Sequence, residues 1–293
     1  MSATTTPFPR AVIFDAYGTL FDVHSVIAAA EQLFPSHGNA LSQLWRQKQI
    51  EYTQLRTLAA RTDAPGEHYR PFWDITLDAL RFAAKKLQLT LGRVAEKRLM
   101  DEYACLSAFP DAVPVLRALR EAASNPNPNP SLNPDQNPAP SSASTTAAAT
   151  TPHVGLAILS NGNPQMLDIA VKSAGMSALF DHVLSVDAVR AYKPSPAAYA
   201  LGPAAFGVAA REIVFVSSNG WDVAGATWFG FTTFWLNRQN APLEELGVTP
   251  HGTGSGMNDL LAFLRAPDSP SPHIGQPEKP RGGGTRKRAG PRA

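Results

Sequence analysis

The chain has 293 residues, enough for one large domain or two ordinary ones, and its 44% hydrophobic and 17% charged composition is typical of a soluble globular protein. Its formal charge is +2, but residues 279–293 contain six basic and no acidic side chains, so removing them leaves −4 for the remainder. The single cysteine, Cys105, excludes an internal disulfide, and the sequence has neither a secretory signal nor an apolar run of about 18 residues. We therefore expect a cytoplasmic protein that does not associate with membranes.

The first predicted element is a short apolar strand, "AVIF", at residues 11–14. Asp15 follows this strand directly, and Tyr17 and Thr19 come shortly after it. An aspartate at this place is often only a turn or helix-capping residue. It is also where a parallel sheet presents side chains to a ligand, so both interpretations stand at this point.

Residues 23–109 show helical periodicity and no convincing strand, which predicts a helical cap inserted after the first strand. In "ALSQLWRQKQIEYTQLRTL", a rotation of about 100° per residue places one group of mainly apolar side chains together. This group is Leu41, Leu44, Trp45, Tyr52 and Leu55. Arg46, Gln47 and Ile50 fall on the opposite side, which could line a pocket for a small anion or be an ordinary surface.

Strands and helices alternate in the second half of the chain, which predicts a doubly wound α/β fold with a parallel sheet. Residues 1–22 and 110–266 would form this core. The predicted strands lie near 154–159, 181–186, 212–216 and 232–236, and the predicted helices near 110–123, 164–176, 195–207 and 221–230.

Two segments have compositions typical of disorder. Residues 124–152 form a proline- and asparagine-rich insertion, and residues 267–293 form a basic tail. Such a tail can bind nucleic acid, but it has no aromatic residue to stack on bases, so we favour a solvated tail and expect no nucleic-acid partner.

Polar residues follow each of the first four predicted strands of the core. Each has a structural alternative: "SNG" is a common turn, Lys193 could be a solvated loop residue, and Asp222 could cap a helix. Because the carboxyl ends of parallel strands share one edge, their joint occurrence predicts a site there. The residues are Asp15, Ser160, Asn161, Lys193, Tyr199, Ser217, Ser218, Asn219, Trp221 and Asp222.

These residues occur in "FDAYGT", "LSNG", "YKP" and "SSNGWD", which resemble the four ordered motifs of the haloacid dehalogenase superfamily. Longer stretches, including "LWRQKQIEYTQLR" and "LSVDAVRAYKP", closely resemble the L-2-haloacid dehalogenases. The resemblance covers nearly all of residues 10–265. It implies a Rossmann-like core with a helical cap, a homodimer, and hydrolysis of 2-haloalkanoates without a cofactor.

Tyr17 separates this group from the phosphatases of the superfamily, which have a second aspartate there and acidic residues in the fourth motif to help hold magnesium. Here the fourth motif begins with the neutral residues Ser217, Ser218 and Asn219. Phosphoryl transfer needs charge neutralisation and a protonated leaving group, whereas a halide leaves as a stable anion. We therefore expect no metal. The alternatives are a magnesium-dependent phosphatase and a catalytically silent protein that binds through its basic tail.

The resemblance also implies catalytic roles. Asp15 would attack the halogen-bearing carbon, form an aspartyl ester and invert the configuration, giving a D-2-hydroxyalkanoate and halide. Lys193 would keep Asp15 ionised, and Asp222 would either activate water or stabilise Lys193. The remaining residues, which would fix the geometry, are Thr19, Tyr199, Ser217 and Asn219.

Substrate contacts follow from the same resemblance. Ser160 and the backbone near Asn161 would bind the carboxylate. Arg46, Asn161 and Phe72 would hold the halide. The residues that would shape the pocket around the alkyl group are Tyr17, Gln47, Ile50 and Trp221. The sequence departs from the family pattern at Gly220, often an alanine, and in the spacing before Phe72.

Overall fold

The structure is a computed structural model that describes residues 9–124 and 154–265. The segments predicted to be disordered, 125–152 of the insertion and 267–293 of the tail, lie outside these residues.

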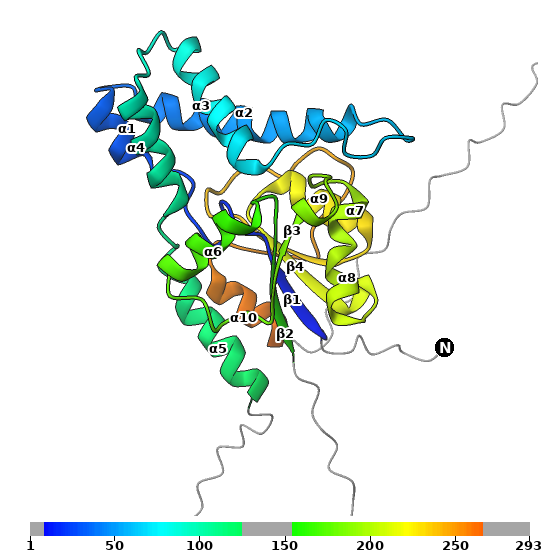
Figure 1. The fold of residues 1–293 in the computed structure, drawn as a ribbon. Helices are drawn as coiled ribbons and strands as arrows, with labels where there is room; N and C mark the ends of the chain where they lie inside the picture. The colour runs from blue at the N-terminus through cyan, green and yellow to red at the C-terminus, as the bar shows by residue number, and fades with distance from the viewer. Residues whose placement is uncertain (1–8, 125–153, 266–293) are drawn as a thin grey trace, which may run out of the picture.

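Six parallel strands form one sheet with the order β3-β2-β1-β4-β5-β6, which confirms the predicted doubly wound α/β fold (Figure 1). The chain passes from β1 outward to β3 and then returns to the other side of β1. This reversal beside β1 is the place where open α/β sheets bind ligands. The strands are β1 (Ala11–Phe14), β2 (Gly155–Ser160), β3 (His182–Ser185), β4 (Ile213–Ser217), β5 (Thr232–Leu236) and β6 (Gly252–Gly254).

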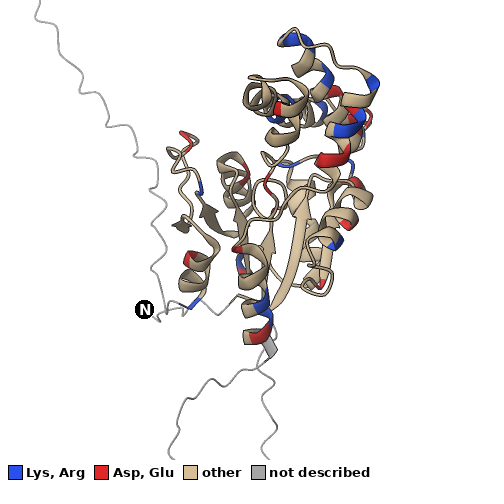
Figure 2. Ribbon diagram, turned by 90° about the vertical axis from the view of Figure 1, so that its left-hand side faces the viewer, with Lys and Arg blue, Asp and Glu red and all other residues tan. Residues whose placement is uncertain are grey.

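Helices cover both faces of the sheet, because each strand of its centre is apolar on both sides. Val12 and Phe14 of β1 belong to one buried cluster, and Ala11 and Ile13 belong to the other. In Figure 2 the strands are free of charged residues, which lie on the surrounding helices and loops. The helices of one face are α5 (Ala112–Ser124), α6 (Pro164–Ser173) and α10 (Met257–Arg265), and those of the other are α7 (Pro196–Tyr199), α8 (Leu201–Phe206) and α9 (Gly220–Phe229).

The edge strand β6 was not expected from the sequence, because "GTG" has no apolar run that signals a strand. Its glycines permit close packing. A Cβ atom at Gly252 would lie 2.6 Å from the Phe263 ring, and one at Gly254 would lie 2.2 Å from Asp259 Cβ. Strand β6 therefore has glycines at positions where the neighbouring side chains leave no room for a Cβ atom.

Four helices form a separate layer over one edge of the sheet, and we propose that they are the cap (Figure 1). The prediction for the face of α2 was wrong at Leu55, which is 53% exposed, while Leu41 and Trp45 are buried as expected. Leu55 lies in the last turn of α2, where the helix ends at Leu58. The four helices are α1 (Ile27–Leu33), α2 (Gly38–Leu58), α3 (Phe72–Lys86) and α4 (Arg93–Ala104).

The two chain segments that join these helices to the core run side by side. The Asp22 N–H donates to Ser107 O (2.8 Å), and the Phe109 N–H donates to Leu20 O (2.9 Å). The helices are thus attached where β1 ends, directly beside Asp15. Across residues 9–124 and 154–265, no helix is both long and apolar enough to cross a membrane.

Replacing Phe231 by alanine should lower the free energy of unfolding by about 3–5 kcal/mol, because this 1%-exposed ring packs on Phe215 and Tyr199. Val94→Ala is the matched control. Val94 is 83% exposed on α4, so its truncation should change stability by less than about 0.5 kcal/mol. Denaturant titration followed by circular dichroism measures both, and equal losses in the two variants would contradict this account of the core.

Candidate active site

Asp15 lies at the carboxyl end of β1 and is 4% exposed. Its backbone N–H still donates to Val216 O of β4 (2.9 Å), so the sheet fixes its position. Its Oδ2 accepts hydrogen bonds from Thr19 Oγ1 and Asn219 Nδ2, both at 2.9 Å, and its Oδ1 accepts one from Lys193 Nζ at 2.7 Å. These three donors fix the orientation of the carboxyl group.

Lys193 is 1% exposed and stands between two aspartates. Its Nζ donates to Asp15 Oδ1 and to Asp222 Oδ2, each at 2.7 Å, and to Leu159 O at 3.2 Å. Tyr199 Oη donates to Asp222 Oδ1 at 2.7 Å. Both oxygens of Asp222 are therefore engaged, and three strand ends are joined by one chain of charged and polar groups.

Burial by itself would lower the pKa of the Lys193 ammonium, but the carboxylates of Asp15 and Asp222 outweigh burial and hold that pKa above the ordinary lysine value. Burial raises the pKa of Asp222, the Asp15 charge adds to this increase, and Lys193 opposes it. Burial and Asp222 raise the pKa of Tyr199 well above the ordinary value, so its phenol remains a hydrogen-bond donor.

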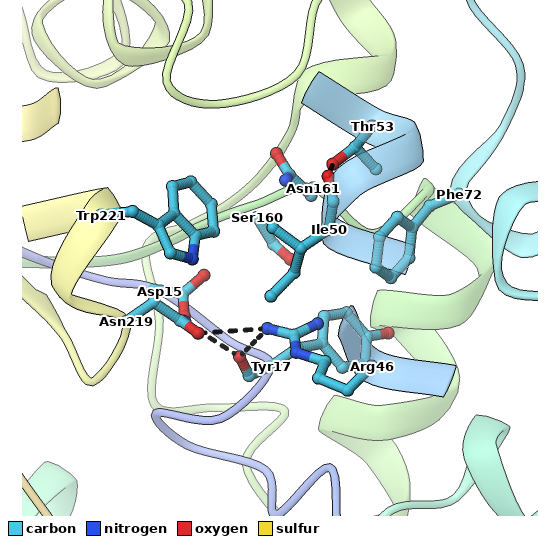
Figure 3. A pocket seen from close by; sticks show the side chains of 10 residues that line it. All are labelled: Asp15, Tyr17, Arg46, Ile50, Thr53, Phe72, Ser160, Asn161, Asn219 and Trp221. Carbon is cyan, nitrogen blue, oxygen red and sulfur yellow. Dashed lines mark hydrogen bonds between the residues drawn. The ribbon is translucent and has the colours of Figure 1, made fainter. Parts of the chain in front are cut away.

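A pocket opens in front of Asp15, between the strand ends and helices α2 and α3 (Figure 3). It contains about 280 Å³ of space, part of it open to solvent. The residues that line it are Asp15, Tyr17, Arg46, Ile50, Thr53, Phe72, Ser160, Asn161, Asn219 and Trp221.

Arg46 brings a positive charge to this pocket. Its Nη2 donates to Tyr17 O (3.0 Å) and Asn219 Oδ1 (3.3 Å), and its Nη1 donates to Gln49 Oε1 (2.7 Å). All three acceptors are neutral, and within the described residues Arg46 forms no salt bridge. The pocket therefore favours an anion.

Aromatic rings form the wall beside Arg46. Tyr17 is 3% exposed, and its ring centroid lies 5.5 Å from that of Phe72 and 5.9 Å from that of Tyr103. Burial raises the pKa of Tyr17, so this residue is a neutral phenol and not a second acid beside Asp15. Phe72 is the first residue of α3, which directs it to the pocket despite the unusual spacing before it.

Polar groups complete the other side of the pocket. Ser160 Oγ accepts from the Gly162 N–H (3.0 Å), and Asn161 Oδ1 accepts from the Lys193 N–H (3.0 Å). Trp221 Nε1 is buried but has no hydrogen-bond acceptor among the described residues. In Figure 3 this nitrogen faces the side of the pocket where Asp15 lies. It is a donor available to a bound ligand.

Most of the residues expected at the site lie together, some in the lining and some directly behind it. Thr19, Lys193, Tyr199 and Asp222 form the bonded layer behind the pocket, and the buried Ser217 accepts the Asn219 N–H through its Oγ at 3.2 Å. The lining includes all of the remaining expected residues except Gln47 and Ser218.

Gln47 is exposed and does not line the pocket, and Thr53, which was not expected, does. The reason is helical geometry. Arg46, Ile50 and Thr53 are separated by four and three residues and share one face of α2, whereas Gln47 is rotated by about 100° from Arg46. The same spacing in the sequence could have identified Thr53.

Comparison with known proteins agrees with this geometry. A sequence model described as haloacid dehalogenase-like hydrolase matches residues 134–230. The chain is 41% identical over 241 residues to an (S)-2-haloacid dehalogenase of Pseudomonas sp. (strain YL), covering 82% of this chain and 88% of the relative.

Two solved structures extend the comparison. The L-2-haloacid dehalogenase RSc1362 is 59% identical and superposes with a TM-score of 0.76, covering 89% of this chain and all of that one. The Xanthobacter autotrophicus L-2-haloacid dehalogenase with chloropropionic acid covalently bound is 34% identical, with a TM-score of 0.70 and coverage of 88% and 98%. The chain therefore belongs to the L-2-haloacid dehalogenases of the haloacid dehalogenase-like hydrolases.

Proposed function

We propose that the protein hydrolyses L-2-haloalkanoates to D-2-hydroxyalkanoates and halide through an ester on Asp15. The observation that carries this proposal is the Asp15 carboxylate, bound by Lys193 and facing a small pocket that holds the uncompensated charge of Arg46. The relatives named as (S)-2-haloacid dehalogenases support the substrate class, and the covalent chloropropionic acid complex supports the ester.

In the first step, a carboxylate oxygen of Asp15 attacks C2 of the substrate opposite the carbon–halogen bond. The carbon–halogen electron pair leaves with the halide, and the configuration at C2 inverts. Lys193, Thr19 and Asn219 hold the carboxylate in place through the hydrogen bonds at 2.7–2.9 Å. No proton needs to reach the leaving group, which agrees with a neutral tyrosine at position 17.

In the second step, water adds to the carboxyl carbon of the ester and the bond between that carbon and the ester oxygen breaks. The product leaves with the original Asp15 oxygen, and Asp15 takes up the oxygen of water. One proton of the water passes to the departing oxygen, which becomes the product hydroxyl, and the other is released to solvent. Lys193 stabilises the oxyanion that forms. We assign Asp222 to holding Lys193, because its two oxygens bind Lys193 and Tyr199 and it does not line the pocket.

For the substrate, we propose that Ser160 and the backbone at Asn161 bind the carboxylate and that Arg46, Asn161 and Phe72 surround the halide. The walls around the alkyl group are Tyr17, Ile50, Thr53 and Trp221. The phosphatase alternative is not supported by the comparisons, since relatives with 35–41% identity are dehalogenases.

We further propose that the protein is cytoplasmic, metal-independent and a homodimer with no nucleic-acid or membrane partner. The family resemblance is the basis for the dimer. The exposed apolar side chains of the α2–α3 pair, Leu55, Leu58 and Phe82, agree with a protein–protein contact on the outer face of the cap.

Offering each enantiomer of 2-chloropropionate separately tests the activity. The L form should release chloride and give D-lactate, because attack from Asp15 inverts the reacting carbon. Ion chromatography and chiral analysis of lactate measure the two products, with and without a magnesium chelator. Release from neither enantiomer, or a product of retained configuration, would refute the proposal.

Single turnover in heavy-oxygen water tests the ester separately. With enzyme in excess over substrate, the lactate formed should contain the light oxygen of Asp15, and the label should appear in the protein. Mass spectrometry of both measures this. Heavy lactate in the first turnover would show that water attacks the substrate directly.

The pKa of Lys193 predicts the pH dependence at the basic end. A raised pKa means that the ammonium survives to higher pH than an ordinary lysine, whose pKa is about 10.4, so its ion pairs are present below that pH and are lost only above it. The pH profile of kcat/KM should therefore have no basic limb below about 10.4 while circular dichroism shows a folded protein. A limb well below that value in folded protein would contradict the raised pKa.

A further inference from the structure

Gln49 is a fully buried residue of α2 to which the proposed reaction gives no role. Its Oε1 accepts hydrogen bonds from Arg46 Nη1 at 2.7 Å and from Tyr103 Oη at 3.0 Å. Its Nε2 donates to Thr76 Oγ1 at 2.7 Å. Both the oxygen and the nitrogen of the Gln49 amide are thus hydrogen-bonded.

The orientation of this amide is determined from both sides. Arg46 can only donate, so the Gln49 atom that faces it must be the oxygen. On the other side, Thr76 gives its hydroxyl proton to Phe72 O at 2.7 Å, so the Thr76 oxygen can only accept from Gln49. The carbonyl of Gln49 is therefore locked toward Arg46.

The same chain of bonds reaches two walls of the pocket. One end holds the Arg46 guanidinium and the other holds the backbone of Phe72, a second residue of the pocket lining (Figure 3). Neither Gln49 nor Thr76 lines the pocket. Gln49 can therefore affect a bound anion only through the groups that it positions.

The neutrality of Gln49 matters as much as its geometry. A glutamate has nearly the same shape and could accept the hydrogen bond from Arg46, but it would lose the bond that Gln49 donates to Thr76 and would neutralise Arg46. Because the present acceptors of Arg46 are neutral, its whole charge is left for an anion in the pocket.

We propose that Gln49 is a positioning residue that aims the Arg46 guanidinium at the departing halide and, by being uncharged, preserves its affinity for that anion. This assignment rests on the proposed function, in which Arg46 holds the halide. Its effect on the rate follows from stabilising the negative charge that the halogen gains as the carbon–halogen bond breaks.

The test is halide binding to the substrate-free protein, measured from the line width of the chloride NMR signal as the protein is titrated with sodium chloride. Gln49→Glu should weaken chloride binding by about 10- to 100-fold, because a carboxylate bound to Arg46 would neutralise the charge that attracts the anion. Gln54→Glu is the matched control. It makes the same substitution on α2 at a half-buried residue about two turns from Arg46 that does not line the pocket, so chloride affinity should stay within about 2-fold of the wild type.

Gln49→Met provides a second variant if Gln49→Glu does not fold. Methionine keeps the charge of Arg46 uncompensated but removes both the acceptor for Arg46 and the donor to Thr76, so chloride binding should weaken by less than with glutamate and by more than with Gln54→Glu. A loss of chloride affinity that is largest for Gln49→Glu, smaller for Gln49→Met and smallest for Gln54→Glu, with folded protein by circular dichroism, supports the assignment. Wild-type chloride affinity in Gln49→Glu or Gln49→Met would overturn it.

Turnover assays separate this assignment from the proposed function. A wild-type protein that binds chloride but releases none from L-2-chloropropionate would refute the reaction and leave the role of Gln49 in anion binding intact. A wild-type protein that binds no chloride in the pocket would overturn the assignment of Gln49, even if dehalogenation occurs.

Discussion

The buried ammonium of Lys193 between Asp15 and Asp222 is the interaction on which the site depends. Two carboxylates this close and this buried cannot both stay ionised without a cation between them, and removing one member of such a network leaves an uncompensated buried charge. The sheet brings the three together, since each follows a different strand. Parallel strand order, and not any local motif, is therefore what creates the nucleophile.

The two cations of the site are treated in opposite ways. Lys193 is compensated by protein carboxylates, whereas Arg46 is bound only by neutral oxygens. The charge of Lys193 thus stabilises two buried carboxylates of the protein, and the charge of Arg46 is available to an anionic ligand. The division also follows the architecture, because Lys193 comes from the core and Arg46 from α2 above it.

The residues that follow strands could be predicted from sequence, because a parallel sheet gathers its carboxyl ends at one edge. Asp15, Lys193 and Asp222 were identified in this way. Residues on α2 were less predictable. Gln47 and Thr53 differ in helical phase, and which part of a broad polar face meets the core depends on packing against α3. Gln49 is polar and fully buried, and neither its burial nor its partner Thr76 follows from periodicity. The glycine-rich β6 carries no strand signal.

The paired backbone segments near Leu20 and Phe109 have a consequence for how such enzymes diversify. Because the chain leaves and rejoins the core at one point, the length and content of everything between can change without altering any strand of the sheet. Asp15, Lys193 and Asp222 all belong to the core, so the helices above them can change while these three groups stay in place. A new substrate range could therefore evolve in this architecture by changes confined to the helices between these two paired segments.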